Sequence, residues 1–211
     1  YMVGDTATGL AAVIDPQRDI DLYVADAAAN GLRIVKVIET HFHADFLSGH
    51  LELAAATGAS IVFGGAAAGR IEFEAETLSN GSHISLGNVD LEILETPGHT
   101  PESISVVVRE SGPNSQPDSV LTGDPLFLGD VGRPDLAQKS ASMTQEQLAG
   151  ILFHSLRDKV MTLADDVVVY PAHGAGSACG KNMSKETVST IGEQKQQNYA
   201  LRANMTEAEF I

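Results

Sequence analysis

The stretch Thr40-His41-Phe42-His43-Ala44-Asp45-Phe46 places two histidines and an aspartate within five positions. It follows directly on the apolar run Ile34-Val35-Lys36-Val37-Ile38, which is typical of a buried strand. A strand that ends in such a cluster holds several metal-ligand side chains on a short loop, where little entropy remains to be lost when a metal binds. The stretch therefore predicts a metal site at the end of a strand.

Three further polar clusters each follow a strand-like run. They are Thr96-Pro97-Gly98-His99-Thr100, Thr122-Gly123-Asp124 and Tyr170-Pro171-Ala172-His173-Gly174. Loops at strand ends are where catalytic residues usually lie, because rigid strands fix their positions. One such histidine alone is more often structural, but four such loops in one chain indicate a shared site. Three other histidines have no partner motif, and we treat them as ordinary surface or core residues: His50, His83 and His154.

The rest of the chain alternates between short strand-like and helical patterns. Strands are expected at residues 10–14, 33–39, 61–63, 83–86, 89–94, 104–108, 120–122 and 167–170. Helices are expected at 19–30, at 48–56 with Ser48 as the cap, at 144–159 and after Ser184. Strand-rich halves that each carry helices suggest an α/β fold of two packed sheets with helices outside.

Length and composition favour one fairly large globular domain. The chain has 211 residues, of which 43% are hydrophobic and 19% charged. A formal net charge of −15 argues against nucleic acid as a partner, since phosphate binding needs a basic stripe. No apolar run approaches the roughly 20 residues of a membrane span. The single cysteine excludes an intramolecular disulfide and suits a reducing compartment, so we expect a cytoplasmic location.

Both ends of the sequence suggest a piece of a longer protein. Tyr1 opens inside an element, so we expect the start to have been trimmed. The segment Thr206-Glu207-Ala208-Glu209 has the capping-box pattern of a helix start, although the sequence stops at Ile211. We therefore expect a domain over residues 1–204, with 205–211 as the start of a helix or linker toward a further C-terminal region.

Taken together, the motifs resemble the metallo-β-lactamase fold over nearly the whole chain, which implies a four-layer αββα sandwich. Within that superfamily the similarity is closer to the persulfide dioxygenases, and closest to the fused persulfide dioxygenase–rhodanese proteins. Three segments carry it: HFHADFLSGH (41–50), GDPLFLGDVGRPDL (123–136) and YPAHGAGSACGK (170–181). The first is specific to the superfamily only, whereas the second and third together are fairly specific to the persulfide group. The resemblance implies a rhodanese-like domain or protein as a partner.

The resemblance also implies a set of metal ligands. In such enzymes the iron is held by residues that correspond to His41, His99 and Asp124 here. Independently of family, two histidines and one carboxylate with open positions suit non-haem Fe(II) and O₂ chemistry. Phe46 stands where dinuclear relatives place another histidine, so we expect one Fe(II) per chain. Zinc and manganese stay open, because ligand identity alone permits all three metals.

The residues around these ligands have expected roles as well. In hydrolytic relatives His43, Asp45 and His173 would bind metal, and here we expect them to orient ligands or to hydrogen-bond substrate and water. For Asp45, capping of the following helix is the alternative. Arg133 either holds a substrate carboxylate or locks its loop to Asp130 or Asp135.

Cys179 is the only thiol of the chain. The ammonium of nearby Lys181 is expected to favour the thiolate and to border the substrate. The resemblance to the fused persulfide enzymes implies a transient persulfide carrier or a substrate-proximal thiol. A small buried residue that fills a glycine-rich loop is the equally weighted alternative.

These expectations favour an oxygenase that converts a low-molecular-weight persulfide, such as glutathione persulfide, with O₂ into sulfite and free thiol. A glyoxalase II-like hydrolase, with two zinc ions and a glutathione thioester as substrate, is the first alternative. A sulfur-relay module that exchanges persulfide between Cys179 and a rhodanese-like partner is the second. No membrane or nucleic-acid partner is expected, and a homodimer is left open.

Overall fold

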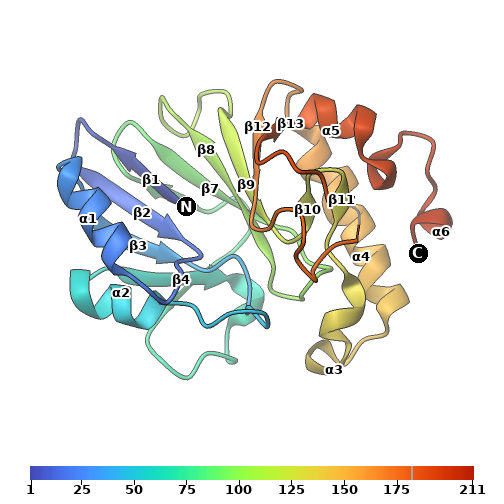
Figure 1. Ribbon diagram of the computed structural model, residues 1–211, viewed down its shortest axis with the longest axis horizontal. Helices are drawn as coiled ribbons and strands as arrows, with labels where there is room; N and C mark the ends of the chain where they lie inside the picture. The colour runs from blue at the N-terminus through green and yellow to red at the C-terminus, as the bar shows by residue number, and fades with distance from the viewer. Residues whose placement is uncertain (182) are drawn as a thin grey trace.

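Two β-sheets lie face to face, and helices cover the outer face of each sheet (Figure 1). The structure is a computed structural model and describes residues 1–181 and 183–211, with the side chains of residues 1–138, 141–181 and 183–211. In that part of the chain, no helix is both long and apolar enough to cross a membrane.

The first sheet holds its strands in the order of the chain. They are β1 (Met2–Asp5), β2 (Leu10–Ile14), β3 (Arg33–Ile38), β4 (Ser60–Gly64) and β5 (Glu76–Leu78). β1 is antiparallel to β2, and β2 to β5 are parallel to one another. Parallel neighbours need crossover connections. These contain α1 (Asp21–Ala29), α2 (His50–Thr57) and the short helix η1 (Gly65–Ala67).

The second sheet has the strand order β13-β12-β9-β8-β7-β6. Its strands are β6 (His83–Ser85), β7 (Asp90–Glu95), β8 (Ile104–Arg109), β9 (Ser119–Gly123), β12 (Val168–Pro171) and β13 (Ser189–Thr190). β9 and β12 are parallel, and the other neighbours are antiparallel. The connection from β9 to β12 holds a hairpin, β10 (Leu126–Phe127) and β11 (Asp130–Val131), and then η2 (Pro134–Ala137), α3 (Gln138–Ala141), α4 (Gln145–Asp158) and η3 (Val160–Thr162). The chain ends with α5 (Ile191–Gln197), η4 (Tyr199–Leu201) and α6 (Glu207–Phe210).

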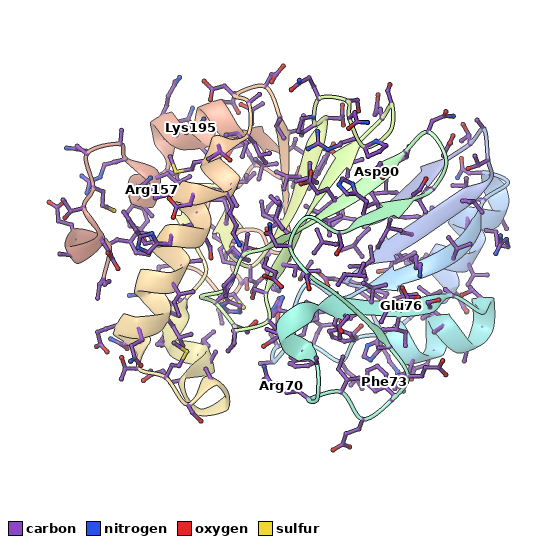
Figure 2. The ribbon with its side chains drawn as sticks, turned by 180° about the vertical axis from the view of Figure 1, so that it is seen from behind. Arg70, Phe73, Glu76, Asp90, Arg157 and Lys195 are labelled. Carbon is purple, nitrogen blue, oxygen red and sulfur yellow. The ribbon has the colours of Figure 1, made fainter. Side chains whose placement is uncertain are left out.

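Strand alternation builds three apolar layers. Along β8, Ile104, Val106 and Val108 face the first sheet, whereas Val107 faces the helices on the other side. The layer between the sheets also contains Ile14 and Ile38, and the outer layers are filled by α1 and α2 on one side and by α4 and α5 on the other. Figure 2 shows Arg157 of α4 and Lys195 of α5 on the side opposite Glu76 of β5. The expected four-layer αββα sandwich is confirmed.

Most expected elements are present, with ends shifted by a residue or two. The capping boxes headed by Thr144 and Thr206 begin α4 and α6. Ser48 was wrong as the cap of α2, because Gly49 occupies that position and the Ser48 hydroxyl donates to the Glu39 carboxylate at 2.7 Å. The helix expected after Ser184 begins only at Ile191. Strands β1, β5, β10, β11 and β13 were missed, because runs of two to four residues show little periodicity.

Candidate metal centre

Five strand ends meet at one edge of the sandwich. β2 and β3 are parallel, and β7, β9 and β12 run in one direction because β8 is antiparallel to both of its neighbours. The loops after these strands contain Asp15, His41, His99, Asp124 and His173. The sheet topology therefore brings together side chains as far apart in the sequence as Asp15 and His173, as is usual for sites at strand ends.

His41, His99 and Asp124 form a buried group of metal-ligand side chains, whose ligand atoms all lie within 4.8 Å of one another. The Nε2 atoms of His41 and His99 lie 3.8 and 3.3 Å from Asp124 Oδ2. Two atoms bound to one ion at about 2.1 Å are ~3.0–3.5 Å apart at octahedral or tetrahedral angles. Asp124 Oδ2 is buried and has no hydrogen-bond partner among the described residues. An ion at this point would satisfy it, so the group fits one metal.

The hydrogen bonds of the two imidazoles leave the atoms that face this point unprotonated. His99 Nδ1 donates to the Arg133 carbonyl at 3.0 Å, since a carbonyl only accepts. Thr40 Oγ1 gives its hydrogen to Asp15 Oδ2 at 2.8 Å and therefore accepts from His41 Nδ1 at 2.9 Å. Burial, helped by nearby His43, also lowers the pKa of His41 to about 4. Both rings thus present a free Nε2 lone pair, as metal ligation requires.

Asp15 fixes the direction of the hydrogen bond between Thr40 and His41. Besides the Thr40 hydroxyl, it accepts the Thr40 backbone N–H at 2.7 Å and the ring of His43, through Nε2, at 3.0 Å. Burial alone would raise the pKa of Asp15, but the hydrogen bond and charge of His43 outweigh it and lower the pKa. Its φ of 48° lies in the left-handed region, where aspartate and asparagine are enriched and where strain often marks functional sites. Sequence analysis assigned Asp15 no role.

Glu102 holds the loop that carries the histidines, a second role that sequence analysis missed. Its buried carboxylate accepts the Phe42 backbone N–H at 3.0 Å and pairs with Arg70 at 2.6 Å. The Arg70 guanidinium lies 4.8 Å from the centre of the Phe42 ring. Arg70, labelled in Figure 2, thereby ties the region after η1 to the metal-ligand loop. Nothing in the spacing of these residues along the chain signals the contact.

Gly132 lets the hairpin after β9 approach Asp124. A Cβ at this position would lie 2.0 Å from the Asp124 carbonyl oxygen and 3.2 Å from His99 Cβ. Only glycine permits such an approach. The glycine of the Gly-Arg-Pro-Asp segment therefore helps to position two of the three candidate ligands.

His173 lies between two carboxylates. Its Nδ1 is 2.7 Å from Asp124 Oδ1 and its Nε2 is 2.6 Å from Asp45 Oδ2. The hydrogen bond to Asp124 raises the pKa of His173 to about 9, against the effect of burial. Burial would raise the pKa of Asp124, but the hydrogen bond from His173 and the neighbouring imidazoles lower it to about 2. Both ring nitrogens of His173 therefore act as donors.

Asp45 pairs with His173, and α2 has no side-chain cap, so the capping alternative for Asp45 is not supported.

Phe46 lies on the open side of this centre. Its ring centre is 4.4 Å from that of His43, and both residues line a cavity of about 600 Å³ with Asp45 and His173. Cavities of this size are typical of small-molecule sites. The structure thus places His43, Asp45 and His173 between the candidate metal ligands and an open cavity.

Cys179 lies in the same region, with its sulfur within 4.8 Å of ligand atoms of Asp45 and His173. It is only 4% exposed. Burial, followed by the charge of Asp124, raises the pKa of the thiol to about 12. The expectation that Lys181 favours the thiolate is therefore wrong. Lys181 is exposed, and its backbone N–H donates to Asp130 Oδ2 at 2.6 Å.

Arg133 is bound within its own loop. Its Nε and Nη2 donate to the two carboxylate oxygens of Asp135 at 3.0 and 2.6 Å, and Nη1 donates to the Ala178 carbonyl at 3.3 Å. These contacts favour the loop-locking alternative. Arg133 and Lys181 line a separate cavity of about 340 Å³ beside α4, and neither residue is in the wall of the cavity next to His173.

The three remaining histidines lie outside the candidate ligand group. His83 pairs with buried Asp90 at 2.5 Å, and His154 pairs with Asp158 at 3.1 Å on the surface of α4. His50 packs against Phe63 and Phe73. The placements of His83 and His154 agree with the expectation that they are ordinary residues, whereas the role of His50 stays a prediction, because its buried ring nitrogens have no hydrogen-bond partner among the described residues and Nδ1 lies 3.8 Å from Glu39.

Comparison with known proteins places the chain among metal-dependent enzymes. The Metallo-beta-lactamase superfamily profile matches residues 2–173. The mitochondrial persulfide dioxygenase ETHE1 of Bos taurus is 29% identical over 98% of this chain and 72% of that protein. The hydroxyacylglutathione hydrolase of Rhodospirillum rubrum is 30% identical over 100% of this chain and 72% of that protein.

Two solved structures share the fold closely. The metallo-β-lactamase of Staphylococcus aureus subsp. aureus COL superposes with a TM-score of 0.87 at 36% identity, over 99% of this chain and 61% of that one. ETHE1 of Myxococcus xanthus gives a TM-score of 0.81 at 30% identity, over 100% of this chain and 82% of that one. The fold, the site at the strand ends and the profile match agree, and the chain belongs to the metallo-β-lactamase superfamily.

Proposed function

We propose that this protein is a mononuclear iron persulfide dioxygenase, which oxidises a low-molecular-weight thiol persulfide with O₂ to sulfite and free thiol. His41, His99 and Asp124 would hold one Fe(II) and leave positions open for both reactants. Fe(II) bound there would supply the redox chemistry by which O₂ reacts with the terminal sulfur. The similarity to persulfide dioxygenases from cattle and from Myxococcus xanthus supports this assignment.

Phe46 carries the preference for one metal over two, because it stands where dinuclear relatives place another histidine and offers no ligand atom. Beside it, ligand atoms of Asp45, His173 and Cys179 lie within 4.8 Å of one another, but this group lacks the histidine that Phe46 replaces. His173 donates to Asp124 at 2.7 Å and to Asp45 at 2.6 Å, so with one metal these groups would hold a proton.

The same pair of residues suits the proton balance of the proposed reaction. One persulfide, one O₂ and one water give one thiol and one sulfite, with release of protons. His173 holds a proton at Nε2 against Asp45, whose side chain is 33% exposed and lines the cavity. This pair provides a route by which protons leave the centre without disturbing the buried ligand Asp124.

Anaerobic reconstitution with Fe(II), followed by oxygen-electrode and sulfite assays with glutathione persulfide, tests the proposal. We expect close to one iron per chain and equal amounts of O₂ consumed and sulfite formed. An Asp124→Asn variant should lose iron and activity. The matched control, Asp90→Asn, changes a buried carboxylate that also pairs with a histidine but at the other end of β7. Absence of both O₂ uptake and sulfite would refute the assignment.

The hydrolase alternative is supported by the similarity to hydroxyacylglutathione hydrolase. It predicts two zinc ions per chain and cleavage of a glutathione thioester without O₂. Metal content of protein purified without added metal separates the two functions. The sulfur-relay alternative is disfavoured by the burial of Cys179, because a thiol that exchanges sulfur with a partner needs access. Sulfite formation and sulfur transfer that are both unchanged in Cys179→Ser would remove that alternative.

A further inference from the structure

The cavity beside His173 has a polar wall that the oxidation chemistry does not use. This wall is formed by Gln17, Arg18 and Asp19, in the loop between β2 and α1, and by Tyr23 of α1. The cavity is therefore shared between the catalytic residues and a segment more than twenty positions earlier in the chain. Such a segment is a natural place for the part of a substrate that does not react.

Tyr23 has a hydrogen to donate into this cavity. Its hydroxyl oxygen accepts the Gln17 backbone N–H at 2.9 Å. That contact uses a lone pair and leaves the O–H free as a donor, and it also fixes the ring relative to the loop. A ligand oxygen in the cavity is the kind of group that such a hydroxyl binds.

Arg18 is the one arginine or lysine in the cavity wall. Its Nη2 lies 2.8 Å from Glu52, but the two side chains are 57% and 39% exposed. Exposed ion pairs of this kind contribute only about 0–1 kcal/mol, so a ligand carboxylate can compete for the guanidinium. Four of its five N–H donors remain for a ligand.

Asp19, next to Arg18, adds a negative charge to the same wall. Among the ion pairs of the described residues, none contains Asp19. Asp15 and Asp45 also line the cavity, but they pair with His43 and His173, so Arg18 and Asp19 are the adjacent charges of opposite sign that suit a ligand with one charge of each sign. A carrier with several phosphates would meet only one guanidinium here and would be repelled by the net charge of −15.

Apolar side chains also line the cavity. They include Ile14, Phe46 and Leu47. They would cover the methylenes in the part of a ligand between its sulfur atom and its amino-acid group. Phe46 thus contributes an apolar surface to the cavity, in addition to replacing a metal ligand.

We propose that this wall binds the α-amino-acid group of the thiol that carries the persulfide sulfur. The carboxylate of that group binds to Arg18 and the Tyr23 hydroxyl, and its ammonium binds to Asp19. The inference rests on the proposed function for the identity of the reacting sulfur, and it moves substrate recognition from Arg133 and Lys181 to the loop between β2 and α1.

Calorimetric binding tests it without turnover, using three sulfur compounds that differ in charge. Glutathione carries an amino-acid zwitterion and a second carboxylate on its glycine, 3-mercaptopropionate only a carboxylate, and cysteamine only an ammonium. In Arg18→Gln we expect about tenfold weaker binding of glutathione and of 3-mercaptopropionate, and unchanged binding of cysteamine. In Asp19→Asn, glutathione and cysteamine should weaken instead. Arg33→Gln, an exposed arginine at the start of β3 outside the cavity wall, is the matched control.

Kinetics with glutathione persulfide then separate this inference from the proposed function. Arg18→Gln and Tyr23→Phe should raise KM about tenfold and leave kcat within about twofold. Glutathione binding that depends on Arg18 in a protein that forms no sulfite would refute the function and leave this site standing. The site is refuted if wild-type protein does not bind glutathione, or if binding is unchanged in Arg18→Gln, and loss of binding in Arg133→Gln would then place recognition at Arg133 instead.

Discussion

Replacement of Asp15 by asparagine should weaken metal binding without a direct contact to the metal. The substitution conserves size, and asparagine tolerates the left-handed backbone that Asp15 adopts. It turns one accepting oxygen into a donating amide and removes the charge of the carboxylate. Asp15 Oδ1 accepts two bonds, from the Thr40 N–H and His43, whereas Oδ2 accepts one, from the Thr40 hydroxyl. The asparagine will therefore keep its oxygen at the first position and direct its NH₂ at Thr40 Oγ1.

That orientation reverses the hydrogen bond to His41. Thr40 Oγ1 then accepts from the amide and must give its own hydrogen to His41 Nδ1, which shifts the ring proton to Nε2, the atom that faces the metal point. A bound metal would have to displace that proton and leave two donors facing each other in a buried site. Such a loss costs about 1–3 kcal/mol. We expect a 10–100-fold loss of metal affinity, or ~1.4–2.7 kcal/mol, as for other residues that orient metal-binding histidines.

Competition of Co(II) or Fe(II) between the protein and a chelator of known affinity measures this effect. Thr40→Val, which removes the hydroxyl, should lower affinity similarly, and the double variant should lose little more because both act through His41. Thr40→Ser keeps the hydroxyl and should match the wild type. Asp90→Asn should reduce stability but not metal affinity, since Asp90, labelled in Figure 2, begins β7, whereas the loop of His99 follows the other end of that strand. A folded Asp15→Asn protein with metal affinity within twofold of wild type would refute this reasoning.

Three further predictions follow from the same geometry. Phe46→His adds a ligand beside Asp45 and His173, so zinc content should rise from about one to about two per chain when zinc is in excess, as elemental analysis will show; content that stays at one would contradict it. Gly132→Ala forces a Cβ against the Asp124 carbonyl and should cost about 1–3 kcal/mol in urea unfolding, whereas Gly174→Ala, where a Cβ meets nothing within 4 Å, should cost far less. Chelation of a metal present at 100 Kd should remove about 2.7 kcal/mol and lower Tm by roughly 5–11 °C, because metal binds only the folded site; an unchanged Tm in calorimetry would argue against binding there.

The sequence allowed the fold and the candidate ligands to be predicted because both depend on repeating local patterns. Apolar runs of five or six residues mark the central strands, and a polar cluster directly after each run marks a shared edge. His41, His99 and Asp124 could be proposed together for that reason. Edge strands such as β5 and β13 were missed, since three or two residues carry no such pattern.

Contacts between distant segments could not be predicted in the same way. Asp15 precedes Pro16 and has the sequence of a turn, but its partner Thr40 is 25 residues away. The ionisation of Cys179 depends on burial, which outweighs a charged neighbour in sequence. For Arg133, the choice between substrate and Asp135 depended on which cavity its loop would border. In each case the role of the residue depends on its contacts in three dimensions, which the sequence pattern does not give.

His173 lies between the candidate metal ligand Asp124 and Asp45, which lines the cavity. A histidine with both nitrogens bound to carboxylates holds a proton, whereas a histidine that binds metal must give one up. Asp124 would bind the metal through Oδ2 and accepts from His173 through Oδ1, so the metal and the proton act on opposite oxygens of one carboxylate. Asp45, on the far side of the ring, reaches the cavity. The residues that would hold a second metal in a hydrolase thus join the candidate metal ligands to the cavity, an arrangement that suits the proposed oxidation with release of protons.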